Sequence, residues 1–200
     1  MIKFQLFIKS QKFHWSTNSI IYAILFSLLF LWLLIDKVFN LEKSILSKTL
    51  AWMCVITFSV GVILKFLNMG RVKPLHGELI GFIFFDDNSI LINDREIFLS
   101  DLKKIYITND DYYGKLVEIS RGNFGPSLSN GTNNFVELVF LDNSREKYQY
   151  ELVNQYDFFN IKSSLIKYHL AGKIDFEDLA SLIYAKSSRE KKYLKEEIYG

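Results

Sequence analysis

Cysteine and proline are scarce in this chain of 200 residues, which contains one Cys and two Pro. With Cys54 alone, no intramolecular disulfide, zinc–cysteine cluster or CxxC redox pair can form. Cys54 lies in an apolar run, so we interpret it as a small apolar side chain. The fold therefore depends on packing and hydrogen bonds rather than on cross-links.

A basic surplus is missing from residues 71–200, which contain 17 Lys and Arg against 20 Asp and Glu, a net charge of −3. Residues 1–70 contain 7 against 2, a net charge of +5. A phosphate-binding domain needs a surplus of Lys and Arg to release counterions. We therefore expect no nucleic-acid partner, and we expect the basic half to meet a membrane surface.

Motifs for metal binding and catalysis are also missing. The three histidines lie far apart in the chain, without ligand spacing such as HExxH. The pairs Asp86-Asp87 and Asp110-Asp111 lie in predicted turns, where solvated aspartates are common. We predict no catalytic residue, no metal site and no cofactor, and we predict that the protein is not an enzyme.

Long apolar runs are what the chain does contain. Residues 20–35 have no charged side chain, and extending the run back to Ser16 gives a segment that spans the ~30 Å hydrocarbon core at ~1.5 Å per residue. Trp15 precedes the run, where an indole ring would lie at headgroup level. We predict an N-terminal cytoplasmic flank at 1–17 and a transmembrane helix at 18–36.

A second apolar run follows after a short loop predicted at residues 37–48. It is predicted to form a transmembrane helix at 49–68, although Lys65 interrupts it. The Lys65 ammonium can reach the headgroups while its alkyl chain stays in lipid. The fold class is therefore a membrane α-hairpin carrying an α+β domain.

A cleaved signal peptide is the main alternative for the first run. No A-x-A-like cleavage site follows it, and a second apolar run comes soon after. The flanks of the two runs carry six Lys and Arg against three in the loop, which favours an inner (cytoplasmic) membrane protein with both termini and the soluble domain in the cytoplasm.

Residues 77–170 show short alternating apolar stretches between turn residues, followed by a helical pattern. We expect a domain of about seven antiparallel strands and then a C-terminal helical extension at 171–200. The strands are expected at 78–85, 89–93, 96–99, 102–108, 115–120, 135–141 and 147–153.

This domain resembles a bacterial PH-like domain tethered by a transmembrane hairpin. The resemblance lies in residues 77–79, 90–92 and 97–105, where Leu99-Ser100-Asp101-Leu102 opens a strand as a similar segment does in such domains. The resemblance implies a bent sheet that is closed by a terminal helix. The first turn, residues 86–89, is acidic rather than basic, so phosphoinositide binding there is not expected.

The loop at residues 122–134 is rich in Gly and Asn and is long for a connection between two strands. It is either a plain hairpin loop or a contact for a partner or ligand. In the second case, the Arg121 guanidinium could pair with an anion. The residues that would make this contact are Arg121, Asn123, Asn130, Asn133 and Asn134. The residues expected to contact the lipid surface are Lys65, Arg71 and Lys73.

The function that these patterns favour is a membrane-anchored, non-enzymatic interaction module, an adaptor or scaffold. Its expected partners are the lipid bilayer and another membrane protein, and self-association is a further hypothesis. The alternatives are a membrane-associated enzyme with an unrecognised site and a small transport or channel subunit.

Overall fold

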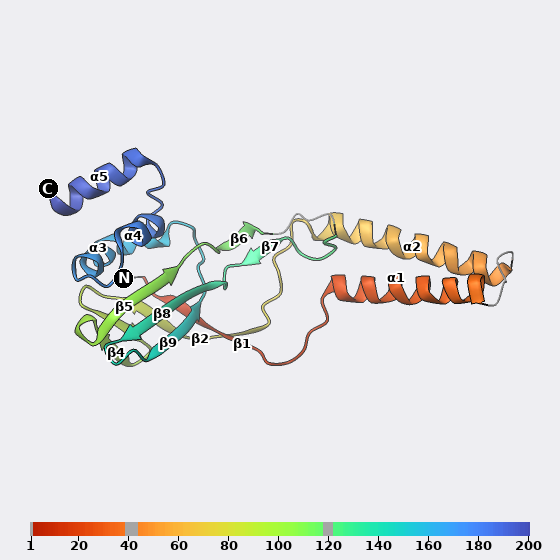
Figure 1. Ribbon diagram of the computed structural model, residues 1–200, viewed down its shortest axis with the longest axis horizontal. Helices are drawn as coiled ribbons and strands as arrows, with labels where there is room; N and C mark the ends of the chain where they lie inside the picture. The colour runs from red at the N-terminus through yellow and green to blue at the C-terminus, as the bar shows by residue number, and fades with distance from the viewer. Residues whose placement is uncertain (1, 39–43, 118–121) are drawn as a thin grey trace. The chain divides into compact units, whose positions relative to one another are not determined.

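The computed structural model describes residues 2–38, 44–117 and 122–200 (Figure 1). The chain divides into two compact units. The sheet unit consists of Met1–Ser10, Leu75–Lys115 and Ser129–Gly200. The hairpin unit consists of Gln11–Pro74 and Leu116–Leu128.

The sheet unit contains a seven-stranded antiparallel sheet with the strand order β4-β3-β2-β1-β9-β8-β5. Its strands are β1 (Phe4–Lys9), β2 (Gly77–Phe85), β3 (Ser89–Ile92), β4 (Arg95–Phe98), β5 (Leu102–Thr108), β8 (Asn134–Phe140) and β9 (Arg145–Tyr150). Two further strands, β6 (Tyr113–Leu116) and β7 (Leu128–Asn130), form a separate two-stranded sheet. The expected α+β class is confirmed for this unit.

The central strand β1 comes from the segment that we predicted to be a flank. It pairs with β2 from Phe4↔Ile83 to Lys9↔Gly77, and with β9 at Leu6↔Tyr150. Of the strand predicted at 115–120, Lys115 and Leu116 lie in β6, outside the large sheet, and residues 118–120 lie outside the described residues. The seventh strand of the large sheet is β1. The alternation of β1 is broken by a bulge between Gln5 and Phe7, which obscures a strand pattern in so short a segment.

Helices gather on one side of the large sheet (Figure 1). They are the 3₁₀ turn η3 (Asp157–Ile161), α3 (Lys162–Leu170), α4 (Phe176–Leu182) and α5 (Ser188–Tyr199). Phe158, Leu165 and Tyr168 are fully buried against the strands. Leu179 and Leu194 belong to the same core, so the expected C-terminal extension packs with the domain rather than projecting from it.

The turn after β2 is tied to α3 by polar contacts. Tyr168 donates its hydroxyl to the carbonyl oxygens of Asp86 and Ser89, at 2.6 and 2.7 Å. The Lys167 ammonium and the Ser164 hydroxyl donate to the Asp87 carboxylate, and both hold the pKa of this carboxyl below its ordinary value of 3.8.

We expect Asp87→Asn to lower the melting temperature of the sheet unit at neutral pH. A carboxyl with a lowered folded-state pKa stabilises the fold above pH 3.8, and this contribution is lost as the pH falls through the folded pKa. Thermal unfolding at neutral pH and well below pH 3.8 tests this. The gap between variant and native protein should close in acid. A gap that persists in acid contradicts the assignment.

The hairpin unit consists mainly of α1 (Thr17–Leu33), the π-helical turn η1 (Leu34–Val38) and α2 (Ile45–Asn68). Ser16 and Ser44 cap the two long helices by accepting from the backbone N–H groups of Ser19 and Ser47. Thr17–Lys37 and Ile45–Asn68 are long and apolar enough to cross a membrane, with mean hydropathy values of 2.3 and 2.1.

The two helices pack against each other in antiparallel fashion. Trp32 Nε1 donates to Ser47 Oγ at 3.1 Å, and Ser47 Oγ donates to Asp36 Oδ1 at 3.2 Å. These bonds join the end of α1 to the start of α2, and we call this the turn end of the hairpin. The other end, where α1 begins and α2 stops, is called the open end.

Candidate functional site

The Gly- and Asn-rich loop was our predicted contact site, and its first part packs into the open end of the hairpin. The Asn18 side chain forms two hydrogen bonds with the loop. Asn18 Oδ1 accepts from the Phe124 N–H at 2.7 Å, and Asn18 Nδ2 donates to Asn123 Oδ1 at 3.0 Å. Asn68, at the end of α2, donates its Nδ2 to the Phe124 carbonyl at 2.9 Å. The loop thus joins both helices.

The Phe124 ring lies inside the hairpin unit and is 5% exposed. Its centroid is 5.6 Å from that of Tyr22, whose hydroxyl donates to the Gly122 carbonyl at 2.9 Å. On α2 the ring faces Gly61, where an added Cβ would lie 3.1 Å from Phe124 Cε1. Glycine at position 61 therefore leaves room for the ring.

The second part of the loop packs around Asp111 in the sheet unit. Asp111 Oδ2 accepts from the Ser129 hydroxyl at 2.7 Å and from the Asn133 N–H at 2.9 Å. Asn134 is fully buried and binds the Asp111 backbone in both directions: its Oδ1 accepts from the N–H at 3.0 Å, and its Nδ2 donates to the carbonyl at 2.7 Å. The same amide donates to the Gly131 carbonyl at 2.9 Å.

The structure thus places the predicted contact residues in different settings. Asn123 and Asn134 are buried and bonded within this chain. Asn130 is half-buried, and its Oδ1 accepts from the Thr132 hydroxyl at 2.8 Å. Asn133 is exposed, and Arg121 lies outside the described residues. A partner contact by these residues stays a prediction, but the buried amides of Asn123 and Asn134 are directed at this chain.

Two buried polar atoms have no hydrogen-bond partner among residues 2–38, 44–117 and 122–200. They are Asp111 Oδ1 and Asn123 Nδ2. One lies in each unit, and both belong to the hydrogen-bonded loop networks described above. Their neighbours on the same side chains are bonded, which is consistent with a structural role for both residues.

The predicted lipid-contact residues lie at the open end of the hairpin. Lys65 is in the last turn of α2, and Arg71 donates from Nη1 to Asn68 Oδ1 at 3.4 Å. The Leu128 N–H donates to the Arg71 carbonyl at 3.1 Å, and the Lys73 N–H donates to the Leu128 carbonyl at 2.8 Å. These two bonds fix the backbone of residues 71–73. These three cations therefore occupy one end of the hairpin unit.

An aromatic groove on the sheet unit was missed by the sequence reasoning. It is a cavity of about 290 Å³ between α5 and the segment that precedes α3, with Ile183, Ala185 and Leu194 among its lining residues. The exposed rings of Tyr193 and Phe159 flank it, and the Tyr156 ring lies 6.0 Å from that of Phe159. We call these three rings the aromatic rim. Tyr156 and Phe159 belong to η3 and its N-cap, whereas Tyr193 lies in α5, so no local sequence pattern predicts that the three rings lie together.

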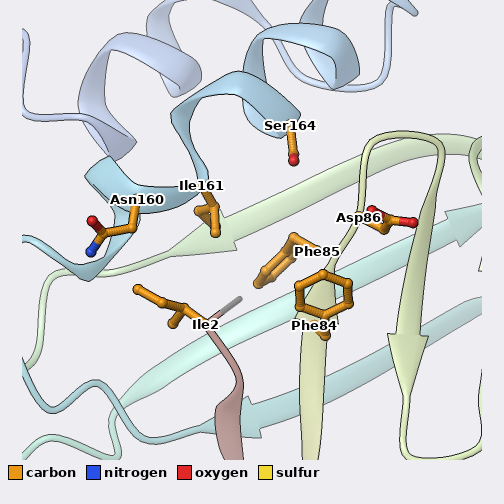
Figure 2. Close-up of a pocket in the computed structure, with 7 residues that line it drawn as sticks. All are labelled: Ile2, Phe84, Phe85, Asp86, Asn160, Ile161 and Ser164. Carbon is orange, nitrogen blue, oxygen red and sulfur yellow. The ribbon is translucent and has the colours of Figure 1, made fainter.

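A second open pocket of about 350 Å³ lies where β2 ends beside η3 and α3 (Figure 2). Ile2, Phe84, Phe85 and Ile161 give it an apolar lining, and Asp86, Asn160 and Ser164 add polar groups. Ser164 already donates to Asp87.

Comparisons with models of protein families, with curated protein sequences and with solved structures found no match. The PH-like resemblance therefore stays a prediction. In the part of the chain that the structure describes, no group of three His, Cys, Asp or Glu side chains is placed to hold a metal ion.

Proposed function

We propose that the protein is a non-enzymatic interaction module, with a PH-like domain that a transmembrane hairpin attaches to the cytoplasmic side of the inner membrane. One observation carries the membrane assignment: only 6% and 11% of the two apolar spans is buried. A core helix of a soluble protein would be mostly buried. Large apolar side chains are exposed along both helices, including Phe26, Phe30, Val55, Phe58 and Phe66.

Strand β1 argues against a cleaved signal peptide. Cleavage after α1 would remove β1 from the chain, and β2 and β9 would lose the strand between them. Because β1 precedes the hairpin and β2 follows it, their pairing requires both to lie on the same side of the membrane. The excess of Lys and Arg in the flanks supports the cytoplasmic side.

The aromatic rim supports the adaptor role. Tyr156, Phe159 and Tyr193 are 57%, 47% and 55% exposed, beside a groove with an apolar lining. Aromatic side chains are enriched at protein interfaces and often dominate their energetics. A partner in the same membrane needs only a weak contact, because anchoring raises the effective concentration of the domain. Another membrane protein is therefore the proposed partner.

The test is in-cell crosslinking of the full-length protein, followed by washing of the membranes with alkaline carbonate. We expect the native chain to stay in the membrane with a crosslinked membrane protein. Tyr156→Ala/Tyr193→Ala should stay in the membrane without that product. Tyr106→Ala/Tyr113→Ala, which changes exposed tyrosines elsewhere on the sheet unit, should retain it.

The membrane part has its own matched pair of variants. Arginine at Phe26, Phe30, Val55 and Phe58 costs about 3 kcal/mol per site at mid-bilayer, so this variant should leave the membrane fraction. Leucine at the same four positions should stay. Release of the native chain by carbonate would overturn the membrane assignment, and equal crosslinking by both tyrosine variants would overturn the role of the rim.

A further inference from the structure

The pocket at the end of β2 has aromatic walls and lies wholly within the sheet unit. Phe85, the last residue of β2, is 1% exposed, and Phe84 before it is 9% exposed. Ile161 of η3 is 5% exposed, and Ile2 completes the apolar part of the lining. Figure 2 shows the two phenylalanine rings between Ile2 and Asp86. These walls are suited to a compact apolar body.

The size of the pocket matches a small molecule. Its volume of about 350 Å³ falls within the ~300–1,000 Å³ that is typical of small-molecule sites. Such sites combine mostly apolar walls with a few polar groups that orient the ligand. Here the polar groups are a carboxylate, an amide and a hydroxyl, from Asp86, Asn160 and Ser164. All three offer oxygen acceptors, so the pocket is suited to a ligand with several hydrogen-bond donors.

The pocket carries one negative charge. Among the described residues that line it, Asp86 alone has an ionisable side chain. No hydrogen bond or ion pair within residues 2–38, 44–117 and 122–200 engages the Asp86 carboxylate. The adjacent Asp87 differs, because the Lys167 ammonium and the Ser164 hydroxyl donate to its carboxylate. The charge of Asp87 is therefore compensated within the fold, whereas the charge of Asp86 is left for a ligand.

Two further features favour a cationic donor. The Ser164 hydroxyl gives its proton to Asp87 Oδ1 at 3.1 Å, so its oxygen meets a ligand only as an acceptor. Aromatic faces attract ammonium groups, and β2 contains an example, because Lys3 Nζ lies 3.9 Å from the centre of the Phe82 ring. Phe84 lies two residues further along β2 and therefore on the same face as Phe82. An ammonium in the pocket thus meets both a carboxylate and an aromatic ring.

We propose that this pocket binds a small molecule with a primary ammonium group on a compact apolar body. The ammonium pairs with the Asp86 carboxylate and donates to the acceptor oxygens of Asn160 and Ser164. The apolar body packs against the rings of Phe84 and Phe85. Charge complementarity selects this class, because Asp86 repels an anion and a neutral molecule leaves its charge unused. The inference goes beyond the proposed interaction role and depends on neither the aromatic rim nor the membrane.

Two isoleucines in the lining provide direct reporters of binding. The probe is phenethylamine, and phenethyl alcohol is its neutral counterpart of the same shape. Each is titrated into the full-length protein in detergent, with isotope-labelled isoleucine methyl groups observed by nuclear magnetic resonance. The phenyl ring of a bound probe shifts the methyl signals of Ile2 and Ile161. Ile8, which is exposed on β1 and does not line the pocket, reports on changes caused by the detergent.

We expect phenethylamine to shift the Ile2 and Ile161 signals in a saturable manner, with a dissociation constant in the millimolar range that suits so small a ligand. Phenethyl alcohol should bind about tenfold more weakly, because it lacks the charged hydrogen bond. Asp86→Asn should weaken phenethylamine by the same factor and leave the alcohol unchanged. Asp94→Asn, which changes an exposed aspartate in the turn between β3 and β4, should bind both probes as the native chain does.

Asp86→Asn keeps the backbone carbonyl that accepts from Tyr168, so the Ile161 signal without probe should stay at its native position. The comparison of amine with alcohol uses the native chain and does not depend on this variant. Equal affinities for the two probes would overturn the proposal. So would equal binding of phenethylamine by Asp86→Asn and Asp94→Asn, or the absence of a saturable shift at Ile2 and Ile161.

Discussion

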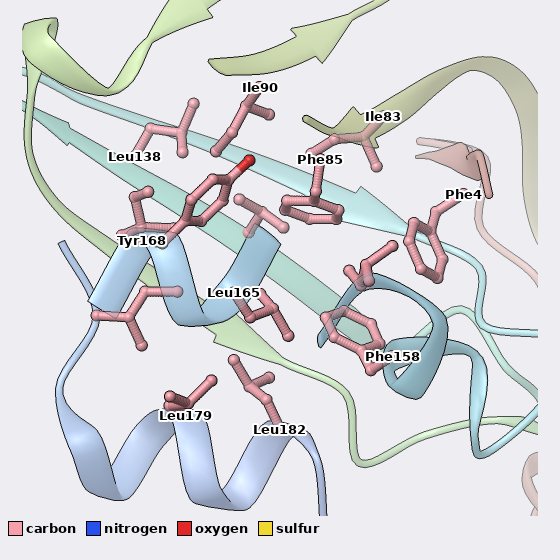
Figure 3. Close-up of a cluster of buried hydrophobic side chains, with 14 of the residues drawn as sticks. Phe4, Ile83, Phe85, Ile90, Leu138, Phe158, Leu165, Tyr168, Leu179 and Leu182 are labelled. Atoms are coloured by element: carbon pink, nitrogen blue, oxygen red, sulfur yellow. The ribbon is translucent and has the colours of Figure 1, made fainter. Parts of the chain in front are cut away.

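Replacing Phe4 by alanine should lower the free energy of unfolding of the sheet unit by about 3–5 kcal/mol. Phe4 is 3% exposed, and its ring centroid lies 5.1 Å from that of Phe158, 5.6 Å from Tyr150 and 5.7 Å from Phe85. Figure 3 shows its side chain in the core beside those of Phe85 and Phe158. Truncation leaves a cavity among these rings, because neighbouring strands and helices cannot close it completely.

The matched control for Phe4→Ala is Ile8→Ala. Ile8 lies on the same strand but is 58% exposed, so we expect a change of about 0.5 kcal/mol or less. Urea unfolding of the full-length protein in detergent, followed by the near-ultraviolet circular dichroism of tyrosine, measures both variants. All three tryptophans lie in residues 15–52, so their signals would report on the hairpin. Equal stability of the two variants would contradict the central position of β1.

Asn134→Ala should destabilise the sheet unit by about 3 kcal/mol or more. The change removes the hydrogen-bond partner of the Asp111 N–H and of the Asp111 carbonyl. It also removes one of two donors to the Gly131 carbonyl, which still accepts from the Leu152 N–H. Each buried polar group that loses its partner costs about 1–3 kcal/mol, and water does not reach a side chain that is fully buried. Asn134→Asp should be worse, because a carboxylate oxygen would then face the two carbonyl oxygens.

The neighbouring residue supplies the control for Asn134. The side chain of Asn133 is exposed, whereas its backbone N–H donates to Asp111. Asn133→Ala keeps that N–H and should change stability by about 0.5 kcal/mol or less. If alanine at 133 and at 134 had the same effect in urea unfolding, the Asn134 side chain would not hold the loop as described.

Local patterns were enough to find most of the large sheet. The alternation of Ile90 with Ile92 and of Ile105 with Ile107 arises within a few residues, and these strands form where expected. Strand β1 could not be found in this way. Its partners lie in β2 and β9, far along the chain, and the long apolar run that follows dominates the local composition.

The candidate sites show the same division between local and long-range information. The composition of the Gly- and Asn-rich loop suggested a contact with a partner. In the structure, side-chain and backbone groups of the loop instead form hydrogen bonds with Asn18, Asn68 and Asp111. Asn18 at the start of the first apolar run and Asn68 at the end of the second were the signs in the sequence of such bonds. The aromatic rim had no sign of this kind, because only the packing of α5 brings Tyr193 near Phe159.

The position of β1 also affects how the chain is made. β1 ends at residue 9 and β9 begins at residue 145, so 135 residues must be synthesised between the two strands. At roughly 5–20 residues per second, this takes roughly 7–27 s. During that time β1 cannot pair with β9, its second neighbour in the sheet, although the hairpin is already emerging from the ribosome. Strand β1 is thus synthesised before both of its neighbours, and its apolar side chains stay accessible to chaperones that bind nascent chains until β9 has been made.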